Sequence, residues 1–496
     1  LCYPAPMRVV FIEVDTERSW AVASIGPGFL AAYLREHGHE VAFVRATVDL
    51  TDAEVVAKVV ATGPQLLAFS LTTRQWLRGA HLVACLRADP ALADVPVVAG
   101  GLHPTFAPEQ VLATPGFDYA CLGEGEEALL ELVTALAAGK PTWRIANLWK
   151  RARPRPGLRP PFEPLDRLPF AARDVLDEPL GTVHMCTQRG CPFPCTYCAA
   201  RMYNQLYDEA GAGEYGRRRS HDNVLAELHA LRAAGRLGYV IFLDDTFTIN
   251  HGWVREFCRR YGEEIRAPFS LHARVETVNE KMLHMLAAAG CQMITYGVES
   301  GSERVRREIM DRQVTNQRFK DVFQWTRDAG ILLTCNFMLG LPGETRDDLQ
   351  QTLDLAEELG VHDFGYFVFY PYPGTALFKV CRERGYLPDD YLTRPANHRQ
   401  SILTLPGLSQ DDIGEYFDRF TALRRRMYLA RTGTLPPDEQ HGAFDLSNPA
   451  AARAMMPTTV GFVPVSPDLV AELQLIVGHE HVITAEAEVE TLSKDC

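Results

Sequence analysis

The stretch Arg189-Gly-Cys-Pro-Phe-Pro-Cys-Thr-Tyr-Cys198 places Cys191, Cys195 and Cys198 in a CxxxCxxC spacing on an expected loop. Three thiolates brought together in this way can hold an iron–sulfur cluster, for which four cysteine ligands are usual. A triplet therefore predicts a [4Fe-4S] cluster in which one iron stays open to another molecule. Zinc sites usually show paired CxxC or His ligands, and no second pair follows. The spacing favours a reactive cluster over zinc or purely structural thiols.

The other nine cysteines are dispersed along the chain, at positions 2, 85, 121, 186, 258, 291, 335, 381 and 496. Most lie in apolar runs, where a thiol behaves as a small hydrophobic group, so we expect no disulfide framework. Cys186 precedes the triplet by five residues and is an alternative fourth ligand of the cluster. Its apolar context, Val183-His-Met-Cys186, favours a buried thiol beside a strand.

Composition indicates a globular protein, because 47% of the 496 residues are apolar and 23% are charged. This length suits two or three domains. Fifty basic and 63 acidic side chains give a formal charge of −13, which disfavours nonspecific nucleic-acid binding. The sequence contains neither an apolar run of roughly 18 residues nor a basic and then apolar N-terminal signal segment. We therefore expect a cytoplasmic protein with neither nucleic-acid nor membrane partners.

Residues 1–145 show alternating strand and helix patterns. Short apolar runs predict strands at 7–12, 41–44, 66–70, 95–99 and 119–122, and amphipathic patterns predict helices at 28–37, 53–61 and 75–87. This alternation is typical of a doubly wound parallel sheet, a Rossmann-like α/β domain. Such sheets bind ligands beyond the carboxyl ends of their strands, where this sequence places Gly26, Gly100, Gly101, Gly123 and Gly125. Because neither GxGxxG nor a P-loop is present, an ordinary nucleotide is not expected.

A Pro/Arg-rich connector within residues 146–180 precedes a second alternating region, 181–400. Strands are expected at 182–185, 239–243, 269–274, 293–298, 332–339 and 364–370, with helices at 222–234, 279–289 and 346–359 among them. Residues 401–496 form a mainly helical C-terminal region, in which a helix over 409–432 is expected to cap the substrate cavity. Residues 465–484 faintly resemble the opening of FAD-linked oxidase domains, which, with Leu1 in place of an initial methionine, suggests an excerpt of a longer chain. The favoured interpretation of this stretch is a plain terminal helix followed by a short strand.

Together these segments resemble the cobalamin-dependent (class B) radical S-adenosylmethionine (SAM) enzymes over roughly residues 7–400. The barrel motifs that carry the resemblance are the cysteine triplet, Tyr296-Gly-Val-Glu-Ser-Gly-Ser302, Phe337-Met-Leu-Gly-Leu-Pro-Gly-Glu-Thr345 and Tyr370-Pro-Tyr-Pro-Gly-Thr375. Segments 26–41, 64–70, 98–105 and 118–126 resemble the cobalamin-binding domain that precedes such barrels. The resemblance implies a partial (βα)6 TIM-type barrel and three cofactors, a [4Fe-4S] cluster, SAM and cobalamin.

The strand ends of the expected barrel carry residue types that suit SAM. Carboxylates suit its ribose or amino group, and arginine suits its carboxylate. The expected SAM residues are Asp244, Asp245, Arg274 and Glu299, to which the resemblance adds Tyr197 and Gly340. An alternative for each acid is a helix N-cap or a surface ion pair.

The resemblance also implies a set of cobalamin-binding residues. They are Gly26, Ser70, Leu71, Thr72, Arg74, Trp76, Gly100, Gly101, His103, Gly123, Glu124 and Gly125. The chain lacks the DxHxxG motif whose histidine coordinates cobalt in other cobalamin proteins. Without that histidine, we expect no protein imidazole on the metal. Arg74 or Trp76 is a candidate to cover the lower face, although Trp76 is equally typical of an ordinary packing aromatic.

The implied function is methylation of an unactivated carbon of a small metabolite, in natural-product biosynthesis, with electrons from a flavodoxin- or ferredoxin-type reductant. A cyclisation or rearrangement without net methyl transfer is the first alternative. A cobalamin-binding sensor with a degenerate barrel is an alternative of another class, which the intact cysteine triplet disfavours. A methylthiotransferase is disfavoured because the N-terminal region has no second cysteine triad. The sequence identifies neither the substrate nor a catalytic side chain.

Overall fold

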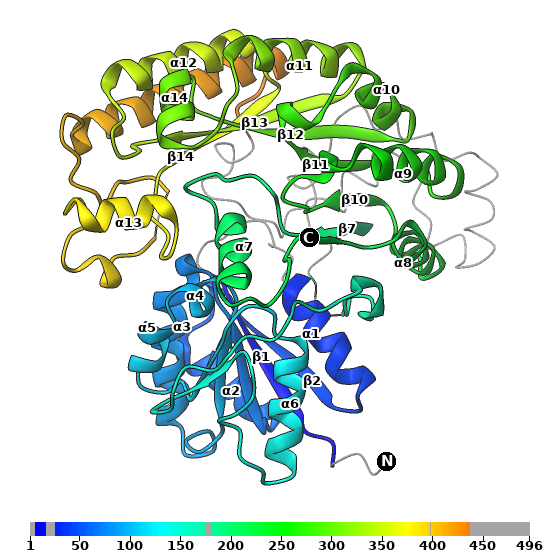
Figure 1. Ribbon diagram of the computed structural model, residues 1–496, viewed down its shortest axis with the longest axis vertical. Coiled ribbons are helices and arrows are strands. Elements are labelled where there is room, and N and C mark those ends of the chain that lie inside the picture. The colour runs from blue at the N-terminus through cyan, green and yellow to red at the C-terminus, as the bar shows by residue number, and fades with distance from the viewer. Residues whose placement is uncertain (1–4, 16–24, 175, 177–180, 397, 437–496) are drawn as a thin grey trace, which may run out of the picture. The chain divides into compact units, whose positions relative to one another are not determined.

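The computed structural model describes residues 5–15, 25–174, 176, 181–396 and 398–436. The chain divides into two units, of which the larger comprises residues 1–17 and 21–433 and the smaller comprises residues 18–20 and 434–496. The helix and strand expected within 465–484 lie outside the described residues. The elements below all belong to the larger unit (Figure 1).

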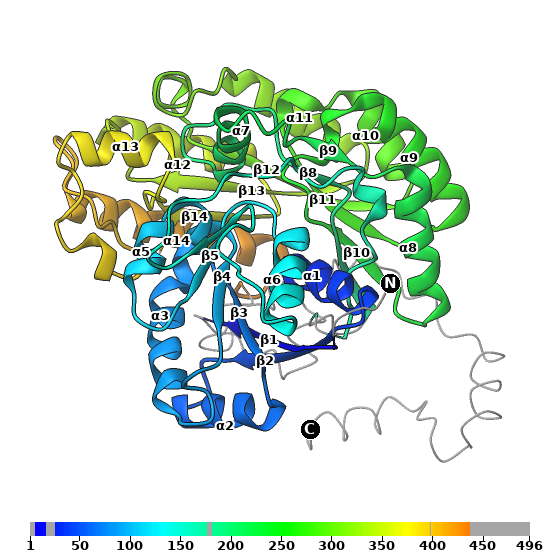
Figure 2. The same cartoon turned by 60° about the horizontal axis from the view of Figure 1, so that its bottom comes forward.

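The N-terminal half of this unit contains a six-stranded sheet in the order β2-β1-β3-β4-β5-β6. Its strands are β1 (Arg8–Val14), β2 (Glu40–Ala46), β3 (Leu66–Ser70), β4 (Val97–Gly100), β5 (Tyr119–Cys121) and β6 (Leu148–Lys150). Helices α1 (Ile25–Glu36) and α6 (Glu126–Ala137) pack on one face, and α2 (Asp52–Thr62) and α3 (Thr73–Ala88) pack on the other (Figure 2). Burial on both faces explains the continuous apolar run of β3.

The doubly wound sheet confirms the expected fold, with one correction at its edge. The first five strands are parallel, but β6 pairs antiparallel to β5, with Leu148 opposite Cys121. Residues 148–150 had been expected to be part of the connector, because a three-residue strand is too short to show a periodic pattern. Two short helices, α4 (Leu102–Phe106) and α5 (Pro108–Ala113), were also not predicted.

A second sheet of six parallel strands has the order β14-β13-β12-β11-β10-β7. Its strands are β7 (Thr182–Met185), β10 (Tyr239–Phe242), β11 (Phe269–Ala273), β12 (Cys291–Glu299), β13 (Leu332–Leu339) and β14 (Asp363–Val368). The helices between them are α8 (His221–Ala233), α9 (His251–Glu264), α10 (Glu280–Ala288), α11 (Asn316–Asp328) and α12 (Arg346–Leu359). They lie along one side of the strands (Figure 1), which confirms the six expected βα units of a partial barrel.

Short elements that were not predicted surround the cysteine loop. A two-stranded ribbon joins β8 (Gln188–Arg189) antiparallel to β9 (Arg217–Arg218). Helix α7 (Ala199–Glu209) begins directly after Cys198, and α13 (Ala376–Glu383) follows the last strand. The cysteine loop is therefore fixed between β8 and α7 (Figure 2).

The expected helix over 409–432 is α14 (Gln410–Thr432). Ser409 forms a capping box with Asp412, and Gly433 ends the helix with a φ of 73°. The helix packs against β14 and α12, and Arg424 pairs with Asp363 at 2.7 Å. These contacts make α14 an outer helix of the barrel, and a role in covering the substrate cavity stays a prediction. Among the described residues, no helix combines the length and apolar character needed to cross a membrane.

Candidate functional site

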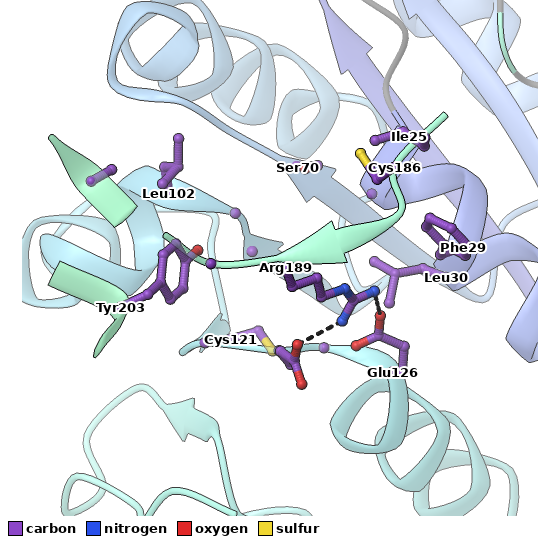
Figure 3. A pocket seen from close by; sticks show the side chains of 18 of the residues that line it. Ile25, Phe29, Leu30, Ser70, Leu102, Cys121, Glu126, Cys186, Arg189 and Tyr203 are labelled. Carbon is purple, nitrogen blue, oxygen red and sulfur yellow. Dashed lines mark hydrogen bonds and ion pairs between the residues drawn. The ribbon is translucent and has the colours of Figure 1, made fainter. Parts of the chain in front are cut away.

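The carboxyl ends of strands from both sheets meet at one cavity of about 420 Å³ (Figure 3). From the first sheet and its loops, the lining includes Gly26, Ser70, Gly100, Gly101, Gly123, Glu124 and Gly125. From the barrel it includes Cys186, Gln188, Arg189, Gly190, Cys198, Ala199, Tyr203, Asp244 and Asp245. Both sheets therefore present the edge at which α/β proteins bind ligands to the same space.

The three cysteines of the triplet lie together beside this cavity. The pKa of Cys198 is raised to about 12, mainly by burial, and Cys195 and Cys191 are close enough to contribute to this shift. Among the described residues, these thiols do not form a group whose ligand atoms all lie within 4.8 Å of one another. A single tetrahedral zinc needs sulfur atoms roughly 3.8 Å apart, since Zn–S bonds are about 2.3 Å. The wider arrangement fits a polynuclear cluster.

Cys186 is separate from the triplet. Burial raises the pKa of its thiol well above the usual value, and the charges that affect it most are those of Asp244 and Arg189. It lines the cavity from the end of β7. This position agrees with the interpretation of Cys186 as a thiol beside a strand.

Asp244 binds the residues that lead into the cysteine loop. Its Oδ1 accepts hydrogen bonds from the backbone N–H groups of Thr187 at 2.9 Å and Gln188 at 2.7 Å, and from the Thr187 hydroxyl at 3.1 Å. Burial raises the pKa of Asp244 to about 6 despite these bonds. The neighbouring Asp245 faces the cavity, and partial desolvation there raises its pKa as well. Asp244 thus positions the loop, while Asp245 offers a carboxylate to a ligand.

Arg274, just past β11, contacts the triplet directly. Its Nη1 donates to Cys195 Sγ at 3.0 Å, and its Nη2 donates to Glu276 at 2.5 Å. A guanidinium at this distance stabilises a thiolate. Arg274 Nε and Asp244 Oδ2 are buried without a hydrogen-bond partner among the described residues. Buried polar atoms normally have partners, so both atoms fit the presence of a polar ligand beside the cysteines.

The other expected SAM residues, Glu299, Tyr197 and Gly340, do not line the cavity. Glu299 ends β12 with a φ of 70°, and burial raises its pKa although Arg312 opposes the shift. Tyr197 is close to Glu299, and burial raises its pKa well above the usual value. Gly340 has a φ of 80° and donates its N–H to Glu344 at 2.7 Å. Burial raises the pKa of Glu344 to about 8.

The expected cobalamin residues divide into two groups. Gly26, Ser70, Gly100, Gly101, Gly123, Glu124 and Gly125 line the cavity, whereas Leu71, Thr72, Arg74, Trp76 and His103 do not. Trp76 is buried and stacks on His103 with ring centroids 4.5 Å apart. Burial lowers the pKa of His103 to about 4, so its imidazole is neutral. Trp76 therefore behaves as the packing aromatic that the sequence left open as an alternative.

The remaining residues outside the cavity have structural contacts. Leu71 is fully buried and accepts a backbone hydrogen bond from His103 at 2.9 Å. Thr72 caps α3 through a capping box with Gln75. Burial raises the pKa of Tyr372 to about 12 and lowers the pKa of His398 to about 4, and Arg74 is close enough for its charge to oppose the first shift and to add to the second. Arg74 thus faces the barrel loops.

A buried group of charges joins the two sheets' loops, and the sequence did not predict it. Glu124 accepts hydrogen bonds from Arg189 at 2.7 Å and from Arg217 at 2.6 Å. Arg189 also donates to Glu126 at 2.5 Å, an ion pair drawn in Figure 3. We call Glu124, Glu126, Arg189 and Arg217 the Glu124 clamp. The only signal in the sequence was the position of Arg189 two residues before Cys191.

Family models match both halves of the chain. Residues 21–133 match the B12 binding domain, and residues 185–356 match the Radical SAM superfamily. A B12-binding domain binds cobalamin, and a radical SAM domain binds a [4Fe-4S] cluster and SAM. The strand-end glycines line one side of the cavity and Cys198 lines the other, so residues of both matched domains border the same space.

Three relatives extend over most of the chain. An uncharacterized methyltransferase of Pyrococcus horikoshii is 29% identical over 395 residues, which cover 76% of this chain and 83% of the relative. Cytidylyl-2-hydroxyethylphosphonate methyltransferase of Streptomyces wedmorensis is 24% identical, covering 82% and 87%. Anaerobic magnesium-protoporphyrin IX monomethyl ester cyclase of Rubrivivax gelatinosus is 26% identical, covering 85% and 78%.

A solved structure shares the arrangement of the two domains. The radical SAM methyltransferase TsrM of Kitasatospora setae, solved with cobalamin and a [4Fe-4S] cluster bound, superposes with a TM-score of 0.62. It is 20% identical and covers 76% of this chain, which itself covers 78% of TsrM. The succession of a B12-binding domain and a radical SAM domain within one such fold shows that the chain belongs to the cobalamin-dependent radical SAM enzymes.

Proposed function

We propose that the protein is a methyltransferase that transfers a methyl group to an unactivated carbon of a small molecule. The observation that carries this proposal is the single cavity lined both by the strand-end glycines of the B12-binding domain and by Cys198 of the radical SAM domain. Because both domains reach one space, a substrate there would contact both cofactor sites. Two methyltransferases among the relatives add support.

Within this proposal the chain holds and separates its cofactors. When bound, the cluster and SAM supply a radical that removes a substrate hydrogen, and cobalamin supplies the methyl group. Cys191, Cys195 and Cys198 would hold the cluster, and Arg274 would stabilise the thiolate of Cys195. Asp245 would bind a hydroxyl or amino group of SAM from the cavity wall. We also propose that a flavodoxin- or ferredoxin-type protein donates the electron.

The test uses anaerobically reconstituted holoenzyme and SAM that carries a CD3 group. With a panel of candidate metabolites, we expect one compound to gain CD3 while 5′-deoxyadenosine and S-adenosylhomocysteine both form, as two SAM molecules are used per methylation. Mass spectrometry measures all three products. A product without CD3, formed with 5′-deoxyadenosine alone, would contradict methyl transfer and support the cyclisation alternative, which the cyclase relative favours. Absence of any SAM cleavage by the fully loaded protein would support a sensor.

A valine at Gly100 is expected to exclude cobalamin from the protein. Gly100 lines the cavity, and an added Cβ would meet only Cys121 Cβ at 3.5 Å, so the new side chain fills ligand space and spares the fold. Overpacking typically costs about 1–3 kcal/mol, which predicts cobalamin binding weaker by about tenfold or more. Cobalamin per chain after gel filtration is read from its visible absorption. Iron content should not change.

Gly101 is a poorer position for this test. Its φ is 97°, and a Cβ there would lie 2.9 Å from the backbone N and O of Leu71, so any substitution strains the fold itself. Gly157→Val is the matched control, because Gly157 has open space around its Cβ position and does not line the cavity. Equal loss of cobalamin in Gly157→Val, or full occupancy in Gly100→Val, would refute the assignment of this cavity to cobalamin.

A further inference from the structure

Three potential metal ligands converge on the surface of the B12-binding domain, away from the cavity. His81 Nε2 lies 2.6 Å from Asp52 Oδ2, and Cys85 Sγ lies 3.6 Å from His81 Nε2 and 3.9 Å from Asp52 Oδ2. All three ligand atoms therefore lie within 4.8 Å of one another. The thiol is half-buried, and the imidazole ring is 56% exposed.

The two helices fix this geometry. His81 and Cys85 are four residues apart on α3, so their side chains share one face of the helix. Asp52 occupies the first turn of α2 and is opposite them. Hydrogen bonds from His81 and Arg78 lower the pKa of Asp52, so its carboxylate is charged. Arg78 Nη1 occupies Oδ1 only, and Oδ2 remains directed to His81 and Cys85.

The arrangement differs from a nucleophilic relay. In a Cys–His–carboxylate relay the thiol and the carboxylate contact opposite nitrogens of the imidazole. Here both approach the same atom, Nε2, of His81. Donors that converge on one point are the pattern of metal ligands.

We propose that Asp52, His81 and Cys85 form a binding site for a zinc-class divalent cation. A thiolate, an imidazole and a carboxylate form the mixed ligand set that zinc accepts, with solvent in the fourth position. Tetrahedral zinc needs S···N and S···O separations of roughly 3.6 Å, close to those observed, and an N···O separation of roughly 3.4 Å. To bind the metal, only the hydrogen bond between His81 Nε2 and Asp52 Oδ2 has to break, so that these two atoms move apart from 2.6 Å. The thiol proton of Cys85 passes to solvent as the metal binds.

A metal here would join the first turn of α2 to the middle of α3. Helix α3 starts at the Thr72 cap, directly after β3, whose last residue Ser70 lines the cavity. Binding to the folded state alone would stabilise this part of the domain by mass action. The site is separate from the cluster cysteines, so its metal content is independent of the proposed methyl transfer.

The test uses holoenzyme whose iron–sulfur cluster is reconstituted, so that the cluster thiols are occupied. Equilibrium dialysis against buffered free Zn²⁺ is followed by elemental analysis of zinc and iron. We expect one tightly held zinc per chain in the wild type, and binding weaker by about tenfold or more in Cys85→Ser and His81→Ala, with iron unchanged. His229→Ala is the matched control, because His229 pairs with Glu264 on the barrel helices and should leave zinc binding unaltered.

Alkylation of Cys85 gives a second measurement that does not depend on the serine variant. Added Zn²⁺ should slow iodoacetamide labelling of Cys85 in the wild type, as followed by peptide mass spectrometry, and should not slow it in His81→Ala. The proposal is wrong if wild type and Cys85→Ser bind zinc equally, or if Zn²⁺ leaves the labelling of Cys85 unchanged. In that case the three side chains form only a hydrogen-bonded surface ion pair.

Discussion

Replacing Cys191, Cys195 and Cys198 together with alanine is expected to lower the iron content of anaerobically purified protein from about four atoms per chain to nearly zero. The three thiols lie together, and they are the cysteines whose spacing suits a cluster. Without thiolate ligands no cluster can be held, so 5′-deoxyadenosine formation should be abolished. Iron analysis, the ultraviolet–visible absorption of the cluster and product chromatography measure the three effects.

Cys186→Ser is the matched control for this triple variant. Cys186 is close in sequence and lines the same cavity, but its charged neighbours are Asp244 and Arg189 rather than the other thiols. It should keep a full complement of iron. A complete cluster in the triple variant, or loss of iron in Cys186→Ser alone, would show that the wrong thiols have been assigned to the metal.

The second large effect is expected at Glu124, where alanine should destabilise the fold by about 3–5 kcal/mol. The carboxylate is 8% exposed and accepts hydrogen bonds from Arg189, Arg217 and the backbone N–H of Phe162. Removing it leaves Arg217, itself 6% exposed, without its carboxylate partner. An unpaired buried charge lowers the free energy of unfolding, because it has lost its hydration and the apolar surroundings do not compensate for that loss. Anaerobic denaturation by guanidinium measures the loss.

Lowering the pH should remove the stabilisation that the Glu124 carboxylate gives to the fold. Burial raises the pKa of Glu124, but Arg189 and Arg217 outweigh burial and hold it below the usual value of 4.5. The folded state therefore binds fewer protons than the unfolded state, and the stabilisation is present above pH 4.5 and is lost as the pH falls through the lower folded value. Glu256→Ala is the control, since this exposed glutamate pairs with Arg259 on the surface. Wild-type stability in Glu124→Ala would disprove the importance of the clamp.

The sequence was most informative where one element shows a complete local pattern. The bounds of β3, β7, β13 and α12 match those expected, because the strands are short apolar or alternating runs and the helix has a cap. Helix α12 illustrates this, since Thr345 and Asp348 form a capping box at its start and Gly360 ends it with a φ of 56°. The cysteine spacing likewise predicts a cluster-binding loop without any tertiary information, and the fold brings its three thiols close together.

Contacts between distant residues were beyond the reach of the sequence. Arg189 and Glu124 are 65 positions apart, and no local pattern links an arginine before a cysteine loop to a glutamate in a Gly-Glu-Gly-Glu turn. The sequence places Trp76 and Arg74 near the end of β3. It does not show whether their side chains point toward the cavity or away from it, because their direction depends on how α3 packs. The same limit explains why Arg274 was expected beside SAM, whereas its contact with Cys195 was not foreseen.

The Glu124 clamp also bears on how far the two domains can be treated as interchangeable modules. Glu124 comes from the turn before α6 and Glu126 begins that helix, and their partners Arg189 and Arg217 come from the ribbon beside the cysteine loop. A chimera that takes its first domain from one relative and its barrel from another keeps this buried pairing only where the two parents carry matching charges at these positions. When the crossover point lies between Glu126 and Arg189, successful recombination of such enzymes would therefore require exchange of these four positions as one set.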